Sequence, residues 1–358
     1  MSGTKYKILC LGASYGSLLA SKLMLAGHDA TLICLPEEAD LINADGIRVR
    51  IPVRGRDGLV EINSNDAPGK VAAAGPGDVD PNDFDLIALA MQEPQYRSPG
   101  VRELLDAAAR SGKPCMSIMN MPPLPYLRRI PALNDLSLDH CYTDPTVWAN
   151  FDPALITLAS PDPQAFRPPE EPVNVLQVSL PTNFKVARFE SDDHTAILRQ
   201  IEQDIIDIRF DPGDGTAVEL PVKLRVHETV FVPLAKWAML LTGNYRCVQP
   251  TAARSIKEAV HTDIDASAAV YAWVRTVCKA IGATDDDLVP FEKYANAATG
   301  LEKPSSAARA LFAGAPNIER VDLLVQTIAT SLDMRSDAVE ETVAMVNDRL
   351  AANRAAAD

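Results

Sequence analysis

Residues 7–35 read KILCLGASYGSLLASKLMLAGHDATLICL, and this stretch decides the fold of the first half of the chain. The two apolar runs, KILCL and ATLICL, are typical of buried strands, and the segment between them has the apolar spacing of a helix. A glycine-containing turn, Gly12-Ala13-Ser14-Tyr15-Gly16, joins the first strand to the helix. The stretch therefore predicts a β-α-β unit of a parallel sheet.

The turn at residues 12–16 fits two unrelated kinds of chemistry. It matches the G-x-S-x-G elbow of serine hydrolases, with Ser14 as the nucleophile, and it also resembles a dinucleotide-binding turn. An elbow normally follows several strands, because the loop that holds the oxyanion is built earlier in the sheet. A dinucleotide-binding turn follows the first strand, so its position favours nucleotide binding, although serine replaces glycine at positions 14 and 17 of the G-x-G-x-x-G pattern.

The composition is that of an acidic, folded protein. The 358 residues are enough for two domains, with 47% hydrophobic and 23% charged residues. A formal net charge of −14 argues against nucleic acid or an anionic membrane as a partner, since both attract basic surfaces. Neither a signal peptide nor a long uncharged run is present in the sequence, so we expect a cytoplasmic protein with a small-molecule ligand. The six cysteines lack C-x-x-C spacing and are expected to be reduced.

Strand and helix patterns alternate in the first half of the chain, and helical patterns alone follow. Further strands are expected at DLIALAM, CMSIMN, LITLAS, NVLQVSL, VARFE and IDIRFD, and a hairpin at IRVRI and LVEIN. Helices are expected at about residues 101–110, 230–241, 255–260, 266–280, 305–312, 317–331 and 336–352. The fold class is therefore α/β, with a Rossmann-type nucleotide-binding domain over residues 1–215 and an all-helical domain for substrate binding or dimerisation over residues 216–358.

Several segments resemble those of one enzyme family and occur in that family's order. GASYGSLLASKLMLAGHDATLICL is similar to its glycine turn, helix and second strand, and the similarity returns at DLIALAMQEPQ, SIMNMPP, LAKWAMLLTGN and KPSSAARALFAGAPNIERVD. Over most of its length the chain thus resembles a divergent member of the ketopantoate reductase (2-dehydropantoate 2-reductase) family. The resemblance implies a Rossmann-type domain followed by a helical domain, and NADPH-dependent reduction of a 2-keto acid in the cleft between them.

Lys236 is the candidate general acid. It is the only charged residue between Val230 and Gly243, and a lysine in such a run either reaches the surface or lies in a cleft where burial lowers its pKa. It matches the family's catalytic lysine, which would protonate or hydrogen-bond the alkoxide formed by hydride transfer. Asn244, eight residues further on, would share its helical face and bind substrate. The family's additional asparagine between them is Leu240 here, so the identity of the substrate stays open.

Asn120, Ser306 and Glu319 complete the candidate substrate site. Asn120 follows a strand-like run, where doubly wound folds bind ligands and where asparagines also make turns, and the resemblance implies contact with the nicotinamide carboxamide or the substrate. Ser305, Ser306 and Glu319 are similar to the family's serine and glutamate, which hold the substrate carboxylate and orient the reacting hydroxyl. These residues also fit helix N-termini, and the spacing leaves the choice between the two serines open.

The cofactor, NADP or NAD, is expected to bind at Gly12, Ser14, Tyr15, Gly16, Ser17 and Gln92. Gln92 stands where the family has a lysine, and Leu35-Pro36-Glu37-Glu38 stands where it has an arginine for the 2′-phosphate of NADPH. Acids at this place accept hydrogen bonds from the ribose of NAD and repel a phosphate. Use of NAD, substitution by Arg48, Arg50 or another basic residue, and loss of nucleotide binding all stay open.

Two further classes of protein remain as alternatives. An opine-type dehydrogenase would need a catalytic histidine, for which His227 is the candidate, and a non-catalytic nucleotide- or metabolite-binding protein would explain the missing family residues. His227-Glu228 begins like the zinc motif H-E-x-x-H, but Phe231 stands at the closing position, so no metal is expected. The oligomeric state is open, with a homodimer among the assemblies considered.

Overall fold

The computed structural model describes residues 4–357 and consists of two compact units. Unit 1 contains the chain up to Met91, Gln95–Met119 and Val147–Glu228, and unit 2 contains Gln92–Pro94, Asn120–Thr146 and the chain from Thr229 onward. The last passage from unit 1 to unit 2 thus comes after the boundary expected near residue 215, and two short segments of the first half belong to unit 2. Within residues 4–357, no helix is long and apolar enough to cross a membrane.

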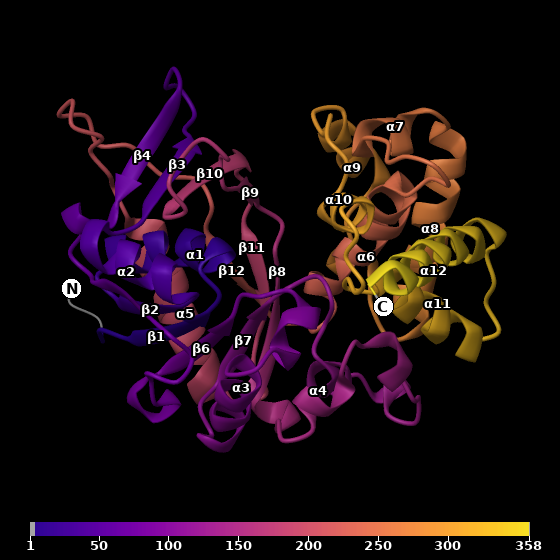
Figure 1. The fold of residues 1–358 in the computed structure, drawn as a ribbon, viewed down its shortest axis with the longest axis horizontal. Coiled ribbons are helices and arrows are strands. Elements are labelled where there is room, and N and C mark those ends of the chain that lie inside the picture. Colours follow the sequence, from indigo (N-terminus) through magenta and orange to yellow (C-terminus); the bar gives the residue numbers. More distant parts are fainter. Residues whose placement is uncertain (1–3, 358) are drawn as a thin grey trace. The chain divides into compact units, whose positions relative to one another are not determined.

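Unit 1 is built on an eight-stranded sheet with the order β12-β11-β8-β7-β6-β1-β2-β5 (Figure 1). All neighbouring strands are parallel except β8 and β11, which confirms the parallel sheet expected from the alternating pattern. The central strands are mostly apolar and buried, as expected for strands covered on both faces. The strands are β1 (Lys7–Leu11), β2 (Asp29–Ile33), β5 (Val71–Ala74), β6 (Leu86–Leu89), β7 (Cys115–Ile118), β8 (Ile156–Ser160), β11 (Phe184–Ala187) and β12 (Leu224–His227).

A second, four-stranded sheet in unit 1 has the order β4-β3-β10-β9. Its strands are β3 (Arg48–Pro52), β4 (Leu59–Asn63), β9 (Gln164–Phe166) and β10 (Val175–Leu180). The antiparallel register of β3 and β4, from Arg48 opposite Asn63 to Pro52 opposite Leu59, confirms the hairpin expected from the sequence. Because β10 pairs with β3, this sheet joins residues near position 50 to residues near position 175.

The helices of unit 1 are α1 (Ser14–Leu25), α2 (Pro36–Asp45), α3 (Val101–Arg110) and α5 (Asp192–Asp207). The expectation of a strand at IDIRFD, residues 206–211, was wrong. The preceding residues form α5, which begins at the capping side chain of Ser191 and buries Leu198, Ile201 and Ile205 at helical spacing. The first two residues of IDIRFD, Ile206 and Asp207, belong to the last turn of α5. Further along the run, Phe210 forms an isolated β-bridge with Val218.

Unit 2 is helical in the part of the chain that the structure describes, as expected. Its α-helices are α4 (Leu124–Leu127), α6 (Lys236–Met239), α7 (Ile256–His261), α8 (Ile264–Ala280), α9 (Phe291–Ala298), α10 (Ser306–Phe312), α11 (Val321–Ser331) and α12 (Asp337–Ala357). The helix expected over residues 230–241 is instead a sequence of short pieces. A 3₁₀ turn at Val232–Ala235 precedes α6, and a π turn at Leu240–Asn244 follows it. Single π turns in helices occur often at functional sites.

The six cysteines are free thiols. Cys34 is partly exposed and the other five are buried. Burial raises the pKa of Cys10, Cys115 and Cys278 to about 12, so these thiols stay protonated and act as small apolar core residues.

Candidate functional site

The turn between β1 and α1 requires glycine at its first position. Gly12 has φ +109°, a conformation that favours glycine, and a Cβ there would lie 2.8 Å from the backbone oxygen of Ala90. The Gly12 amide donates to the Ile33 oxygen at 3.0 Å, so the turn is held against the end of β2. The close backbone approach and the tight turn are those that a dinucleotide-binding loop needs.

Gly16 has a different role from Gly12. A Cβ on Gly16 would lie 3.3 Å from Leu32 Cδ2 and 3.4 Å from Cys10 Cβ, so this glycine allows α1 to pack closely on β1 and β2. Close helix–strand packing is the role of the last glycine in the dinucleotide-binding pattern. The turn therefore keeps the roles of the first and last glycine of the pattern, in Gly12 and Gly16. Three residues, with Ser14 in the middle, separate these two glycines, whereas four separate them in the pattern.

The N-terminus of α1 can accept an anion. The helix begins at Ser14 with Ala13 at the N-cap; no side chain caps it and its first turn contains no acidic residue. Backbone N–H groups and the helix dipole at such an end favour a phosphate. Ser17 donates to the Ala13 oxygen at 2.5 Å, and Tyr15 donates from its hydroxyl to the Pro163 oxygen at 3.0 Å. The residues of this turn thus fit the pyrophosphate of a dinucleotide.

A pocket in unit 2 brings together most of the other residues expected from the sequence. It is lined by Gln92, Asn120, Leu240, Asn244, Tyr245, Ser306, Ala307, Ile318 and Glu319. Gln92, which we expected on the cofactor side, thus lies among the candidate substrate residues. His227 is not among the lining residues; it lies on β12 of unit 1, where burial lowers its pKa.

Glu319 is the buried acid of the pocket. It is 7% exposed, and its Oε2 accepts from Asn120 Nδ2 at 3.0 Å. Its Oε1 faces the backbone N–H groups of Glu93 at 3.4 Å and Met121 at 3.5 Å. Burial raises the pKa of Glu319, while these donors and the positive charge of Lys236 oppose the rise. The carboxyl group is therefore fixed in position and lies within the electrostatic reach of the candidate general acid.

Asn120 has a polar atom without a partner. Its Nδ2 is used by Glu319, but its buried Oδ1 makes no hydrogen bond to any residue between positions 4 and 357. A buried acceptor without a partner costs about 1–3 kcal/mol unless a ligand or water satisfies it. The amide of Asn120 thus presents an acceptor suited to a donor group on a ligand.

Lys236 precedes the π turn, and Asn244 is its last residue. Lys236 begins α6 and is partly buried, and Asn244 ends the π turn and lines the pocket. The eight-residue spacing suggested that the two residues lie on one regular α-helix. They do not, because the π turn between Leu240 and Asn244 has i→i+5 hydrogen bonds. Leu240, at the place of the family's additional asparagine, also lines the pocket and gives it an apolar wall.

The two serines have separate roles. Ser305 caps α10, since its Oγ accepts from the Ala308 amide at 3.1 Å and donates to the Asn244 backbone oxygen at 2.7 Å. Ser306 lines the pocket instead. Of the two serines left open by the spacing, Ser306 is therefore the one that lines the pocket together with Asn244 and Glu319, whereas Ser305 contacts the Asn244 backbone.

Two residues of the site were not expected from the sequence. Tyr245 donates from its hydroxyl to the backbone carbonyl oxygen of Glu319 at 2.6 Å and accepts from the Val321 amide at 3.0 Å, which fixes the segment that carries Glu319. Glu93 is 2% exposed, and its carboxylate accepts from the amide and hydroxyl of Thr143 at 3.0 and 2.9 Å. The feature of the sequence that could have pointed to Glu93 is its position directly after Gln92, in a stretch that resembles the family.

The pKa of Glu93 predicts a pH-dependent stability. Burial and the nearby Glu319 raise it from 4.5 to about 7, against the hydrogen bonds from Thr143. The folded protein therefore binds a proton more tightly than the unfolded chain, so this group's contribution to stability is lost as pH rises from about 4.5 to about 7. Glu93→Gln should leave the free energy of unfolding unchanged near pH 4.5 and raise it by up to about 3 kcal/mol at pH 8.

Urea unfolding at the two pH values would measure this difference. Glutamine keeps the shape of the protonated acid, and the Thr143 hydroxyl can turn to accept from its amide. Glu292→Gln, at an exposed position of α9, is the matched control and should show no such pH dependence. Equal stabilities of wild type and Glu93→Gln at pH 8 would show that Glu93 carries no buried charge.

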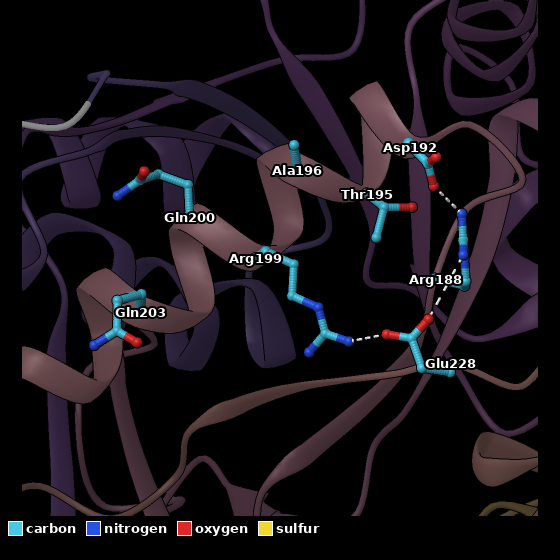
Figure 2. A pocket seen from close by; sticks show the side chains of 8 residues that line it. All are labelled: Arg188, Asp192, Thr195, Ala196, Arg199, Gln200, Gln203 and Glu228. Atoms are coloured by element: carbon cyan, nitrogen blue, oxygen red, sulfur yellow. Dashed lines mark hydrogen bonds and ion pairs between the residues drawn. The ribbon is translucent and has the colours of Figure 1, made fainter.

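A separate groove in unit 1 runs along α5 (Figure 2). Its charged side chains are paired with one another: Arg188 with Asp192 and Glu228, and Arg199 with Glu228. Thr195, Ala196, Gln200 and Gln203 complete its lining. The groove contains none of the residues expected from the sequence to bind substrate or cofactor.

The fold is shared with solved reductases and dehydrogenases, although no family model and no curated protein matches the sequence. A 2-dehydropantoate 2-reductase from Methylococcus capsulatus matches with a TM-score of 0.65 and 12% identity over 97% of each chain. A D-mandelate dehydrogenase in complex with NADH and anilino(oxo)acetate matches with a TM-score of 0.63 and 13% identity, over 97% of this chain and 99% of that chain.

A dimeric ketopantoate reductase from Staphylococcus aureus matches with a TM-score of 0.60 and 10% identity, over 97% of this chain and 99% of that chain. The likeness extends over almost the whole length of all three chains. The fold of this chain, a Rossmann-type unit together with a helical unit, is therefore the fold of the ketopantoate reductases, as the resemblance implied.

Proposed function

We propose that this protein is an NAD(P)-dependent oxidoreductase that reduces a small 2-keto acid or a related carbonyl compound. The observation that carries the proposal is the pocket of unit 2, which collects Asn120, Asn244, Ser306 and Glu319. Lys236 adds its charge to the environment of Glu319. The glycine turn of unit 1 and the fold shared with NADH-binding and ketopantoate-reducing enzymes support a dinucleotide as the second reactant.

The pocket suits a substrate that is polar at one end and apolar at the other. Ser306 and Asn244 offer a hydroxyl and an amide, which can donate to a carboxylate. Leu240, Ala307 and Ile318 also line the pocket, whose cavity of about 20 Å³ would have to widen for a hydrocarbon substituent to pack against them. The proposed substrate is therefore a 2-keto acid with an apolar side chain, and the bound anilino(oxo)acetate of the D-mandelate dehydrogenase is a ligand of this general kind.

The chain's own residues would manage the proton and the orientation of the carbonyl group. NADH or NADPH, when bound, supplies the hydride. Lys236 would then give a proton to the oxygen that becomes the hydroxyl, since an ammonium is a positioned proton donor. Glu319, held by Asn120 and by backbone amides, would accept a hydrogen bond from that hydroxyl and fix its direction. The free Oδ1 of Asn120 would accept from the amide of the nicotinamide or from the substrate.

The nucleotide would be held by backbone rather than by charged side chains. The tight turn at Gly12 and the uncapped first turn of α1 present N–H groups to a pyrophosphate. Ser14 is the first residue of this helix, so a larger side chain at this position would contact a bound phosphate directly. Gly16 is less suitable for a test, because it faces Leu32 and Cys10 and a larger residue would disturb the core.

A carboxylate at position 14 should block nucleotide binding. Ser14→Glu places a negative charge at the helix N-terminus, where it favours the helix but repels the pyrophosphate. We expect the dissociation constants of NADH and NADPH, measured by titration calorimetry, to rise at least about 100-fold, whereas Ser14→Ala should change them less than about fivefold. Unchanged binding in Ser14→Glu would contradict nucleotide binding at this turn, and no binding of either nucleotide to the wild type would contradict the proposed function.

A further inference from the structure

The end of β2 adjoins the glycine turn and is where the adenosine ribose of a dinucleotide lies in Rossmann-type folds. The Gly12 amide donates to Ile33, the last residue of β2, at 3.0 Å. Leu35, which follows, is 74% exposed, although most large apolar side chains of the chain are buried. Glu37 and Glu38 come next, in the first turn of α2. The residues after β2 thus offer an apolar surface and two acids to a ribose and its base.

Glu38 has an ion-pair partner from a distant part of the chain. Its Oε1 accepts from the guanidinium of Arg167, the residue that follows β9, and the two side chains are 11% and 30% exposed. The same segment reaches the glycine turn, since the Pro163 oxygen accepts from Tyr15 at 3.0 Å. Residues 163–167 therefore contact both the glycine turn and the first turn of α2, which follows β2.

The charge balance at this place is acidic. Arg167 supplies one positive charge, and its partner Glu38 and the exposed Glu37 supply two negative charges. Arg50, the other candidate from the inserted strands, is bound to Glu61 at 2.7 Å and to Glu171 at 2.6 Å. A 2′-phosphate, with a charge near −2, would have to compete with Glu38 for Arg167, whereas a 2′-hydroxyl could donate to the second carboxylate oxygen of Glu38.

We propose that the Arg167–Glu38 ion pair sets the cofactor preference and makes this protein select NADH over NADPH. The proposal rests on the proposed function, because it needs a dinucleotide at the glycine turn. It assigns two roles: Glu38 is the acceptor for the ribose hydroxyls, and Arg167 holds Glu38 in place and neutralises it only in part. Removal of the Glu38 charge would free Arg167 for a phosphate and remove the preference for NADH.

The test is the ratio of the dissociation constants of NADPH and NADH, measured by titration calorimetry on the intact chain. The wild type should bind NADH at least about tenfold more tightly than NADPH. Glu38→Gln should lower this ratio at least about tenfold, mainly through tighter NADPH binding. Arg167→Met should weaken NADPH further, and the double variant Glu38→Gln/Arg167→Met should lose the gain in NADPH affinity. Glu37→Gln, the exposed neighbour, is the matched control and should change the ratio less than about threefold.

The outcomes separate this proposal from the proposed function. If NADPH binds the wild type as tightly as NADH, or if Glu38→Gln leaves the ratio unchanged, the ion pair does not select the cofactor, although the oxidoreductase proposal stands. If neither nucleotide binds, both proposals fail. A change in ratio of the same size in Glu37→Gln would show a general charge effect in place of a specific contact, and would also overturn the role of Glu38.

Discussion

Lys236→Ala should lower kcat for carbonyl reduction by about 10²–10⁴-fold, the usual contribution of a positioned general acid. The dissociation constant for the nucleotide should stay within about threefold of the wild-type value, because the proposed binding groups are the backbone N–H groups of the glycine turn, which this substitution does not change. Steady-state kinetics with a 2-keto acid, together with nucleotide titration, would measure both quantities.

Lys236→Arg separates proton donation from simple charge. Arginine keeps the positive charge but cannot be deprotonated in proteins, so it cannot act as the acid. We expect it to restore less than about a tenth of the lost activity. Lys257→Ala, which removes an exposed lysine that pairs with Glu302, is the matched control and should retain wild-type kcat. Full activity in Lys236→Arg would assign the lysine a purely electrostatic role.

Lys22→Met should stabilise the protein. Lys22 lies in α1, is 2% exposed, and its Nζ makes no hydrogen bond to any residue that the structure describes. Burial, and then the charge of Lys223, lower its pKa from 10.5 to about 7. At pH 7 the unfolded chain therefore binds this proton much more tightly than the folded protein does. The difference lowers the free energy of unfolding by up to about 5 kcal/mol. Methionine fills similar space without this cost.

The stability gained by Lys22→Met should depend on pH. Because the folded pKa lies below the unfolded value, wild-type stability rises with pH between about 7 and 10.5, and the advantage of Lys22→Met shrinks over the same interval. Urea unfolding or hydrogen exchange of the β1 amides, at pH 7 and pH 9.5, would measure it. Lys70→Met, at an exposed position of unit 1, is the control. A destabilised Lys22→Met at pH 7 would show that the ammonium has a favourable partner in the folded protein.

Much of the fold could be predicted because its signals are local. The β1-α1-β2 unit appears as two apolar runs around a helical spacing, and the hairpin of β3 and β4 as two alternating runs separated by glycines. The error at IDIRFD has a local cause as well. Isoleucines and an aromatic residue favour strands, but the capping Ser191 and the buried spacing of Leu198, Ile201 and Ile205 carry the helix through to Asp207.

The site could be predicted only in part, because its decisive contacts join distant residues. The resemblance pointed to Asn120, Asn244, Ser306 and Glu319, and the pocket contains all four. No local pattern could show that Glu93 lies against the segment of Glu319, 226 residues away, or that Arg167 pairs with Glu38, 129 residues away. The π turn after Met239 was also hidden, since its sequence reads as an ordinary apolar helix.

The most direct test of the central claim is nucleotide oxidation by the wild-type protein with 2-keto acids. The panel would range from pyruvate to acids with branched alkyl and phenyl side chains, each with NADH and with NADPH, and the loss of reduced nucleotide would be followed by absorbance. We predict turnover that favours the apolar side chains and that is lost in both Lys236→Ala and Ser14→Glu. Tight nucleotide binding without turnover across the panel would contradict the claim and favour a non-catalytic binding protein.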